Sequence, residues 1–338
     1  MSIARQALMR CYAHLETARP YTIGYVGLVG LAGAALTGTD ATGQAWFVAW
    51  AAPTLGWLAA LYGGDYFDRR LDAVSKPHRP IPSGRMHPLE ALAGMLLCAT
   101  LGAFLASSTN ERTLGLVVAA LLLGVSYSCL FKARGLMGNL VRGSITALAF
   151  LFGTMTVSDL PRASLLPIAL LFWIHDAGTN LVGTIRDVDG DRAGGYRTLA
   201  VARGVPAAIR FAFAAYLVWL CLALTVPWLV ESGRSTSLYW AMLCPAAIAW
   251  IAALHPLSSK VPVEPRAALR AHEWLVLERI VLAGALLVYG AGPAYATPAL
   301  LILLATAISQ VRLRGQYEFA GRPTMAPDAL SAPARVSP

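Results

Sequence analysis

Long apolar runs alternate with short polar segments along most of the chain. A helix needs roughly 20 apolar residues to cross a bilayer. Ten runs approach or exceed this length: residues 20–40, 44–64, 87–107, 112–131, 138–157, 164–185, 205–230, 238–255, 274–292 and 297–311. The final two are short, and Pro293 and Pro298 break them apart. The pattern predicts an all-α protein, a polytopic transmembrane bundle of nine to ten helices.

The basic residues predict which ends of these runs face the cytoplasm, because cytoplasmic loops carry the excess of Lys and Arg. With the N-terminus inside, 23 of the 27 basic residues fall on the inner side. The outer loops hold only Arg112, Arg162 and Arg234, and Arg279 lies within a run. We therefore expect an integral protein of the cell inner membrane with an even number of spans. Nine spans with a re-entrant last segment stay open as an alternative.

The ends of the chain differ from the apolar centre. Residues 1–19 mix basic and apolar positions and predict an N-terminal interfacial helix. Residues 20–311 form the predicted transmembrane domain. Residues 312–338 contain four prolines and predict a disordered cytoplasmic tail that is dispensable for chemistry. The net charge of +9 is explained by the loop bias and by anionic membrane lipids as partners, so no nucleic-acid partner is expected.

Acidic residues cluster where two of the apolar runs end. The chain has 18 Asp and Glu residues, and six of them lie within residues 64–72 and 186–191. Carboxylates at this density repel one another and are costly near hydrocarbon, so a polyvalent cation is the natural compensation. Two such clusters that face each other predict magnesium ions holding a diphosphate.

The spacing of the first cluster places its carboxylates on one helical face. Steps of three and four residues separate Asp65, Asp68 and Asp72. Three prolines within the loop of residues 75–85 exclude a continued helix and make this loop stiff. The loop carries Lys76, Arg79 and Arg85 past the carboxylates. It is therefore expected to form a cationic lid over an anion.

The second cluster extends back into its membrane span. Steps of four, four, three and four residues connect Asp176, Asn180, Thr184, Asp187 and Asp191. These positions line one helical face, whereas Asp189 points elsewhere. A polar face of this length is not tolerated against lipid, so it predicts a central polar cavity. Arg192 and Arg197 follow as further donors for phosphate oxygens.

Simpler explanations compete with this interpretation. One acidic motif at a helix end is often only a solvated loop edge or a charge pair, but two motifs on the same side at helical spacing favour a shared site. Asp176, next to His175, has two interpretations. It is either a structural carboxylate of the bundle or a group that orients or deprotonates the acceptor of a transfer reaction.

The two acidic segments resemble the signatures of the UbiA superfamily of intramembrane prenyltransferases. Residues 64–72, with the Arg-Pro-Ile-Pro-Ser-Gly sequence at 79–84, are similar to the first signature, an NDxxDxxxD motif before an RPxxSG loop. Residues 180–192 are similar to the second, DxxxD-type signature. Residues 127–132 and 138–143 are similar to a weaker pattern between the two. The resemblance covers roughly residues 15–310.

Two positions depart from the family pattern. Gly64 stands where the first motif usually has Asn, and Thr184 stands where several members have a further Asp. Each departure removes a potential ligand and puts the number or affinity of bound metal ions in doubt. Neither touches the DxxxD pairs Asp68/Asp72 and Asp187/Asp191.

The resemblance implies a fold, usually of nine helices around a central cavity, and a mechanism. Mg2+ bridges the Asp carboxylates to a prenyl diphosphate, which ionises to an allylic cation in an apolar, water-poor chamber. The implied metal ligands are Asp65, Asp68, Asp72, Asp187 and Asp191. The implied catalytic residues are Asp68, Asp72, Asp187, Asp191 and Asp176. The implied substrate-binding residues are Asn180, Lys76, Arg79, Lys132, Arg142 and Arg197.

The acceptor stays open at this point. An aromatic carbon, the hydroxyl of a chlorophyllide or glycerophosphate lipid, and a quinone precursor all fit an unidentified lipophilic or aromatic acceptor. The segment 187–192 looks closer to the lipid-type members. Two other functions compete: a terpene cyclase on the same scaffold, which needs no acceptor, and a transporter or lipid-binding protein. No repeated halves with broken helices support transport.

Overall fold

The computed structural model describes residues 3–38, 41–231, 235–258 and 262–319, and these are almost entirely helical. The helices are α1 (Ile3–Ala18), α2 (Pro20–Thr37), α3 (Gly43–Ser75), α4 (Pro88–Ser107), α5 (Thr113–Ser126), α6 (Leu136–Met155), α7 (Leu166–Arg186), α8 (Val188–Ala193), α9 (Leu199–Arg203), α10 (Val205–Leu229), α11 (Thr236–Ser258), α12 (Pro265–Ala291), α13 (Ala296–Ser309) and α14 (Gly315–Glu318). Two short strands, β1 (Arg134–Gly135) and β2 (Arg197–Thr198), pair in parallel.

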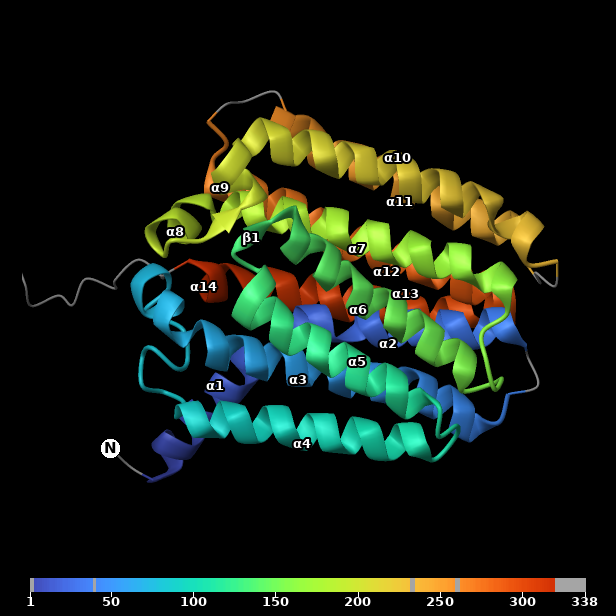
Figure 1. The fold of residues 1–338 in the computed structure, drawn as a ribbon, viewed down its shortest axis with the longest axis horizontal. Helices are drawn as coiled ribbons and strands as arrows, with labels where there is room; N and C mark the ends of the chain where they lie inside the picture. Colours follow the sequence, from blue (N-terminus) through green and yellow to red (C-terminus); the bar gives the residue numbers. More distant parts are fainter. Residues whose placement is uncertain (1–2, 39–40, 232–234, 259–261, 320–338) are drawn as a thin grey trace, which may run out of the picture.

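Ten helical segments of the described chain are long and apolar enough to cross a membrane, as the ten runs predict. Figure 1 shows them lying side by side along the long axis of the molecule. The fold is therefore the all-α membrane bundle expected from the sequence. A wide π-helical turn at Tyr127–Phe131 extends α5, and another at Gln310–Arg314 joins α13 to α14.

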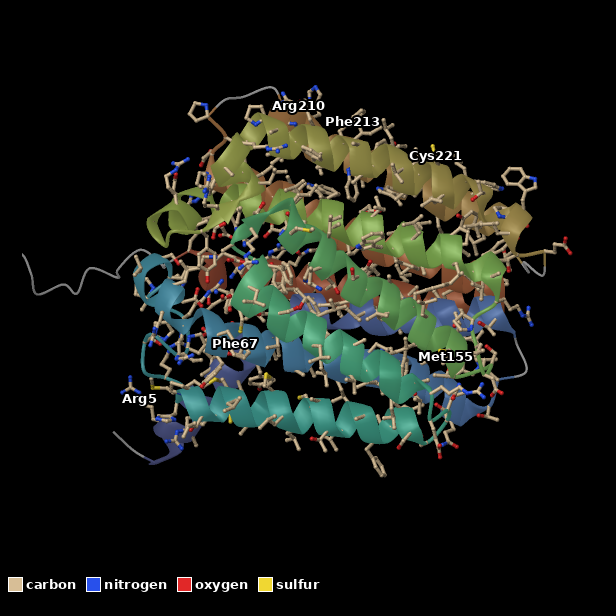
Figure 2. All side chains as sticks on the ribbon, in the orientation of Figure 1. Arg5, Phe67, Met155, Arg210, Phe213 and Cys221 are labelled. Carbon is tan, nitrogen blue, oxygen red and sulfur yellow. The ribbon has the colours of Figure 1, made fainter. Side chains whose placement is uncertain are left out.

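The bundle has a buried centre and an apolar outer surface. Most residues of α2 and α12 are buried. The two helices pack against each other, α2 also packs against α6, and α12 also packs against α7. The outer helices expose large apolar side chains such as Phe104 on α4 and Leu122 on α5. Figure 2 shows Phe213 and Cys221 on the outer edge of α10. An apolar exterior of this kind suits a lipid environment.

Two glycines, Gly30 and Gly153, let α2 approach α3 and α6 closely. A Cβ atom added at Gly153 on α6 would lie 1.9 Å from the carbonyl oxygen of Gly30 on α2. A Cβ added at Gly30 would lie 2.0 Å from the carbonyl oxygen of Ala49 on α3. Small residues at such positions let membrane helices approach closely. These contacts fix the spacing of α2, α3 and α6, all of which carry residues of the site described below.

One end of the bundle gathers the polar segments. α3 has 33 residues and carries the first acidic motif to its last turns. α7 ends at Arg186, and the chain resumes helix in α8, which carries the second motif. The β1–β2 pair ties the segment after α5 to the segment after α8. Both motifs therefore lie at the same end, with α8, β1 and α14 close together in Figure 1.

The first residues of the expected disordered tail, 312–319, belong to the described part of the chain. The chain stays helical to Glu318, and Arg314, Tyr317 and Glu318 are buried. The reason is electrostatic, because the carboxylate of Glu318 lies among cations at the polar end of the bundle. Residues 320–338 lie outside the described part of the chain. Helix α1 forms as expected, and its place at the membrane interface stays a prediction.

Replacing Gly153 with Ala tests the close approach of the helices. The added methyl group meets a backbone carbonyl that cannot move by a rotamer change, so α2 and α6 must separate. We expect Gly153→Ala to destabilise the protein by roughly 1–3 kcal/mol, measured as a lower unfolding temperature in detergent. Gly115→Ala on α5 is the matched control, because a Cβ there meets nothing within 4 Å. Equal unfolding temperatures for the two variants would contradict the packing argument.

Candidate active site

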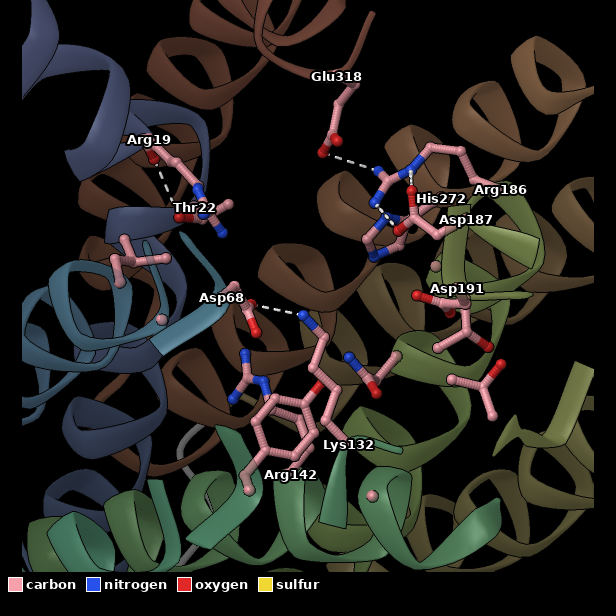
Figure 3. Close-up of a pocket in the computed structure, with 18 of the residues that line it drawn as sticks. Arg19, Thr22, Asp68, Lys132, Arg142, Arg186, Asp187, Asp191, His272 and Glu318 are labelled. Atoms are coloured by element: carbon pink, nitrogen blue, oxygen red, sulfur yellow. Dashed lines mark hydrogen bonds and ion pairs between the residues drawn. The ribbon is translucent and has the colours of Figure 1, made fainter. Parts of the chain in front are cut away.

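A cavity of about 390 Å³ lies at the polar end, between α3, α6, α7 and α12. Both acidic motifs contribute to its wall. The lining residues that bear carboxylates are Asp68, Asp72, Asp176, Asp187, Asp189, Asp191 and Glu318. The basic lining residues include Lys76, Arg79, Lys132, Arg142, Arg186 and Arg279. The structure thus brings the two sequence motifs together around one charged space, part of which is drawn in Figure 3.

The first motif is neutralised by two cations from other segments. Lys132 Nζ lies 2.5 Å from Asp68 Oδ2, and Figure 3 marks this pair. Arg79 donates from one nitrogen to both oxygens of Asp72, each at 2.9 Å. Although burial opposes it, the charge of Asp68 raises the pKa of Lys132, which stays protonated. The second oxygen of Asp68, Oδ1, is buried without a hydrogen-bond partner in the described structure.

The second motif continues across the break between α7 and α8. Lys76 Nζ lies 2.9 Å from Asp187 Oδ1, and Arg186 lies 2.6 Å from Asp187 Oδ2. Burial works against ionisation of Asp187, but these two cations hold its pKa well below the usual range. Asp191 differs, because burial and the nearby negative charge of Asp187 raise its pKa to about 6. Asp191 is thus a carboxylate whose negative charge is poorly compensated.

Asp189 and Asn180 occupy the places that the helical face predicts. Asp189 sits at the rim with a side chain that is 86% exposed and pairs with Arg192 at 3.4 Å. Asn180 lines the cavity and accepts a hydrogen bond of 2.8 Å from the amide of Asn139. The predicted polar face of α7 is therefore one wall of the cavity.

Asp65 does not reach the cavity. Its carboxylate is held by Thr17 at 3.0 Å, by Arg19 at 2.5 Å and by the hydroxyl of Tyr317 at 2.9 Å. These three donors tie α3 to the N-terminal and C-terminal segments, so Asp65 fills a structural position. Asp65 does not line the cavity in this structure because its oxygens are engaged by these three donors, and its role as a metal ligand stays a prediction.

Arg197, a predicted substrate-binding residue, does not line the cavity either. Its backbone N–H donates to the carbonyl of Ala133 in the short β pairing, and its side chain is exposed. Strand geometry rather than helix geometry sets its direction. Arg186 supplies a basic side chain of the kind expected from Arg197, because it lines the cavity and contacts Asp187.

Asp176 and its neighbour His175 face opposite ways. Asp176 is buried at the cavity wall, where it accepts a 3.0 Å hydrogen bond from Thr146 and lies 3.6 Å from Arg142 and 3.5 Å from Arg279. His175 is fully buried, does not line the cavity and lies 2.9 Å from Glu278. Of the two residues, only Asp176 is in a position to contact a bound molecule.

Two residues of the site were missed by the sequence analysis because they follow the last membrane run. Glu318 lies 2.8 Å from both Lys76 and Arg186 and 3.5 Å from Arg79. Figure 3 shows its carboxylate directed toward Arg186. The ring of Tyr317 lies against the guanidinium of Arg79, 4.4 Å from the ring centre. Only a count of unpaired cations in the loops would have suggested a carboxylate here.

A second, apolar cavity adjoins the charged one. It measures about 90 Å³ and lies between α3, α4, α5 and α6. Except for Ser128 and the indole N–H of Trp57, its described lining is apolar, with residues such as Met95, Leu121 and Phe152. Trp57, Gly64 and Ile145 line both cavities, among others. A charged chamber is thus joined to an apolar groove that suits a hydrocarbon chain.

The donor set fits Mg2+ that is shared with a ligand. Among the described residues, no three of His, Cys, Asp or Glu converge to hold a metal on their own. Mg2+ is commonly held by one or two carboxylates together with phosphate oxygens of the substrate. The unpartnered Oδ1 of Asp68 and the poorly compensated Asp191 supply such carboxylates from the two motifs. A metal that is also bound by a diphosphate would therefore fit this cavity.

Comparison with known proteins identifies the family. The model of the UbiA prenyltransferase family matches residues 25–276. The chain belongs to the UbiA prenyltransferase family. This UbiA protein is 32% identical over 279 residues to a digeranylgeranylglyceryl phosphate synthase from Ignicoccus hospitalis, covering 80% of this chain and 91% of that one. It is 30% identical over 220 residues to the synthase from Methanopyrus kandleri, covering 64% and 79%.

Solved structures agree in fold. A UbiA homologue from Aeropyrum pernix superposes on this UbiA protein with a TM-score of 0.65 at 17% identity, covering 80% of this chain and 97% of the other. A homologue from Archaeoglobus fulgidus bound to GPP and Mg2+ gives a TM-score of 0.62 at 15% identity, covering 88% and 99%. Family membership confirms the resemblance seen in the acidic motifs, and it makes the chain a prenyltransferase.

Glu318→Gln tests how the C-terminal carboxylate acts on the cation cluster. The change removes a charge shared by Lys76, Arg79 and Arg186, so we expect the ligand-free protein to lose roughly 3 kcal/mol of stability. The same change removes a carboxylate that competes with other anions. Inorganic pyrophosphate should then raise the unfolding temperature more in the variant than in the wild type.

Glu111→Gln, in an exposed loop at the opposite end, is the matched control for this prediction. It should change neither the unfolding temperature nor the response to pyrophosphate. A Glu318→Gln protein that responds less to pyrophosphate than the wild type would show that Glu318 supports anion binding instead.

Proposed function

We propose that this protein is a Mg2+-dependent enzyme that transfers an isoprenyl group from a prenyl diphosphate to the hydroxyl or aromatic carbon of a lipophilic acceptor. The observation that carries the proposal is the junction of a chamber lined by both acidic motifs with an apolar groove. The chamber matches the charge of a diphosphate with its metal, and the groove matches an isoprenyl tail. The A. fulgidus homologue bound to GPP and Mg2+ supports this assignment.

The rim of the chamber holds the diphosphate in this proposal. Lys76, Arg79, Lys132 and Arg186 supply positive charge around it. Asp68, Asp72, Asp187 and Asp191 would hold Mg2+, which adds charge that stabilises the departing diphosphate. The cations of the chain act in the same direction, because each offsets negative charge that grows on the leaving oxygen as the C–O bond breaks.

The apolar groove protects the cation that forms when the diphosphate leaves. An allylic carbocation reacts with water, so the carbon that bears it must lie in a dry environment. Trp57 lines both cavities, so in this proposal the reacting carbon lies near its side chain, between the charged chamber and the groove. Ionisation and transfer would thus take place beside Trp57.

The relatives suggest the class of acceptor. Two synthases of digeranylgeranylglyceryl phosphate are at least 30% identical to this chain. Their name indicates a glycerophosphate lipid that carries isoprenoid chains, which fits a hydroxyl acceptor. Asp176 is the candidate group to orient or deprotonate that hydroxyl, because it is the carboxylate at the inner wall of the chamber. The orientation with both acidic motifs at the cytoplasmic face of an inner membrane belongs to the same proposal.

Diphosphate release by the purified full-length protein in detergent tests this function. Geranyl, farnesyl and geranylgeranyl diphosphates would each be supplied with Mg2+ or with EDTA, and with or without a panel of hydroxyl and aromatic acceptors. We expect release that needs both Mg2+ and an acceptor. Release without an acceptor, accompanied by a cyclic hydrocarbon or alcohol, would assign the protein as a terpene cyclase instead.

Substitution of the two aspartates of α8 tests whether Asp191, the proposed metal ligand, contributes more to turnover than Asp189, which is exposed at the rim. Asp191→Ala removes a buried carboxylate that faces Asp187, and we expect turnover to fall by roughly 100-fold or more. Asp189→Ala removes an exposed carboxylate, and turnover should fall by less than about fivefold, because an exposed ion pair contributes at most ~1 kcal/mol. Steady-state turnover at saturating substrates measures both. Equal losses would contradict the helical-face assignment of α7 and α8.

A further inference from the structure

Two arginines at the inner wall of the chamber share a single carboxylate. Asp176 on α7 lies 3.6 Å from Arg142 on α6 and 3.5 Å from Arg279 on α12. All three side chains line the cavity and are largely buried. The carboxylate next along α12, Glu278, does not line the cavity and contacts His175 instead. The trio therefore carries one excess positive charge.

The surroundings hold both guanidinium groups in place without neutralising them. Arg142 lies against the ring of Trp57, 4.0 Å from its centre, and Arg279 lies against the ring of Tyr25 at 4.3 Å. Arg279 is 4% exposed, and its Nε has no hydrogen-bond partner in the described structure. An unbalanced charge and an unpaired donor within a membrane span are costly. Such an arrangement indicates a site that is completed by an anion from the cavity.

This anion site is distinct from the cations at the rim. Asp176 precedes Asp187 by eleven residues, which corresponds to about 16 Å along a helix. The rim cations contact Asp72, Asp187 and Glu318, whereas Arg279 contacts none of these. The inner site instead adjoins Trp57, which also lines the apolar groove. An anion bound there lies beside the place where the prenyl carbon would react.

We propose that Arg142 and Arg279 bind an anionic group of the acceptor, a phosphate or a carboxylate, and that Asp176 orients the two guanidinium groups. This inference rests on the proposed prenyl transfer and narrows its acceptor class. Two sources share the chemistry, a glycerophosphate lipid and an aromatic carboxylate. The proposal also assigns Arg142, which the sequence analysis counted among the substrate-binding residues, to the acceptor rather than to the prenyl diphosphate.

Pairs of acceptors that differ only in the anionic group test the assignment with the full-length protein in detergent. One pair is geranylgeranylglyceryl phosphate and its dephosphorylated diol, and the other is 4-hydroxybenzoate and 4-hydroxybenzyl alcohol. The acceptor KM should be at least about 10-fold lower for the anionic member of one pair. The pair that shows this difference tells whether the anionic group belongs to a glycerophosphate lipid or to an aromatic carboxylate. Equal KM values for the charged and neutral members of both pairs would overturn the inference.

Variants then link this preference to the two arginines. Arg279→Gln and Arg142→Gln should each raise the KM of the anionic acceptor by about 10- to 100-fold. The KM of the prenyl diphosphate should stay within about twofold, since its cations are elsewhere. Arg279→Lys keeps the charge and should restore part of the loss. Arg162→Gln, on an exposed loop, is the control for an arginine outside the site. If the KM of the prenyl diphosphate increases more than the KM of the acceptor, the two arginines bind the diphosphate and the inference is wrong.

A binding measurement separates failure of this inference from failure of the proposed function. Lysophosphatidic acid and the matching monoacylglycerol would be compared for their effect on the unfolding temperature, without prenyl diphosphate. Stabilisation by the phosphate lipid alone, lost in Arg279→Gln or Arg142→Gln, supports the anion site even if no transfer is detected. If both lipids stabilise the protein equally, and 4-hydroxybenzoate gives no greater shift than its alcohol, the anion site is refuted, whatever the turnover. If Arg279→Gln does not fold, Arg142→Gln and Arg279→Lys are measured in its place.

Discussion

Compensation of buried carboxylates is the constraint on which the rest of this structure depends. A charged side chain inside a membrane bundle is costly unless a partner of opposite sign is within reach. Asp68, Asp72 and Asp187 each have a Lys or Arg partner contributed by a different segment. These ion pairs connect α3 to the loop after α5, and the loop after α3 to the end of α7. The site and the contacts that close the polar end of the bundle are therefore the same interactions.

The sequence predicted those features that follow from the length of the apolar runs or from helical spacing. Apolar runs of bilayer length located the ten spans, and helical spacing placed Asp176, Asn180 and Asp191 on one wall. Asp65 shared that spacing with Asp68, but helical period alone does not say which side of the stripe faces the cavity and which faces a neighbouring helix. Its partners Thr17 and Tyr317 come from opposite ends of the chain, so no local pattern could reveal them.

Residues outside regular helices were the hardest to place. Arg197 was expected to follow the end of the helix as a further donor for phosphate oxygens, yet it lies in a two-residue strand pairing with an exposed side chain that does not line the cavity. Glu318 follows a segment rich in Arg and precedes a proline-rich one, which indicated a solvated tail. Its burial depends on Lys76, Arg79 and Arg186, which are more than a hundred residues away. Long-range charge pairing of this kind leaves no trace in the spacing of apolar and polar residues.

The position of Glu318 has a consequence for biosynthesis. Membrane helices are made and inserted in order from the N-terminus, so α14 leaves the ribosome last among the described helices. Until then, Lys76, Arg79 and Arg186 lack the carboxylate that all three share. The rim of the chamber is thus assembled only after the last described helix has been translated. A nascent chain that has inserted nine spans contains both acidic motifs but does not yet contain the carboxylate of Glu318 at the rim.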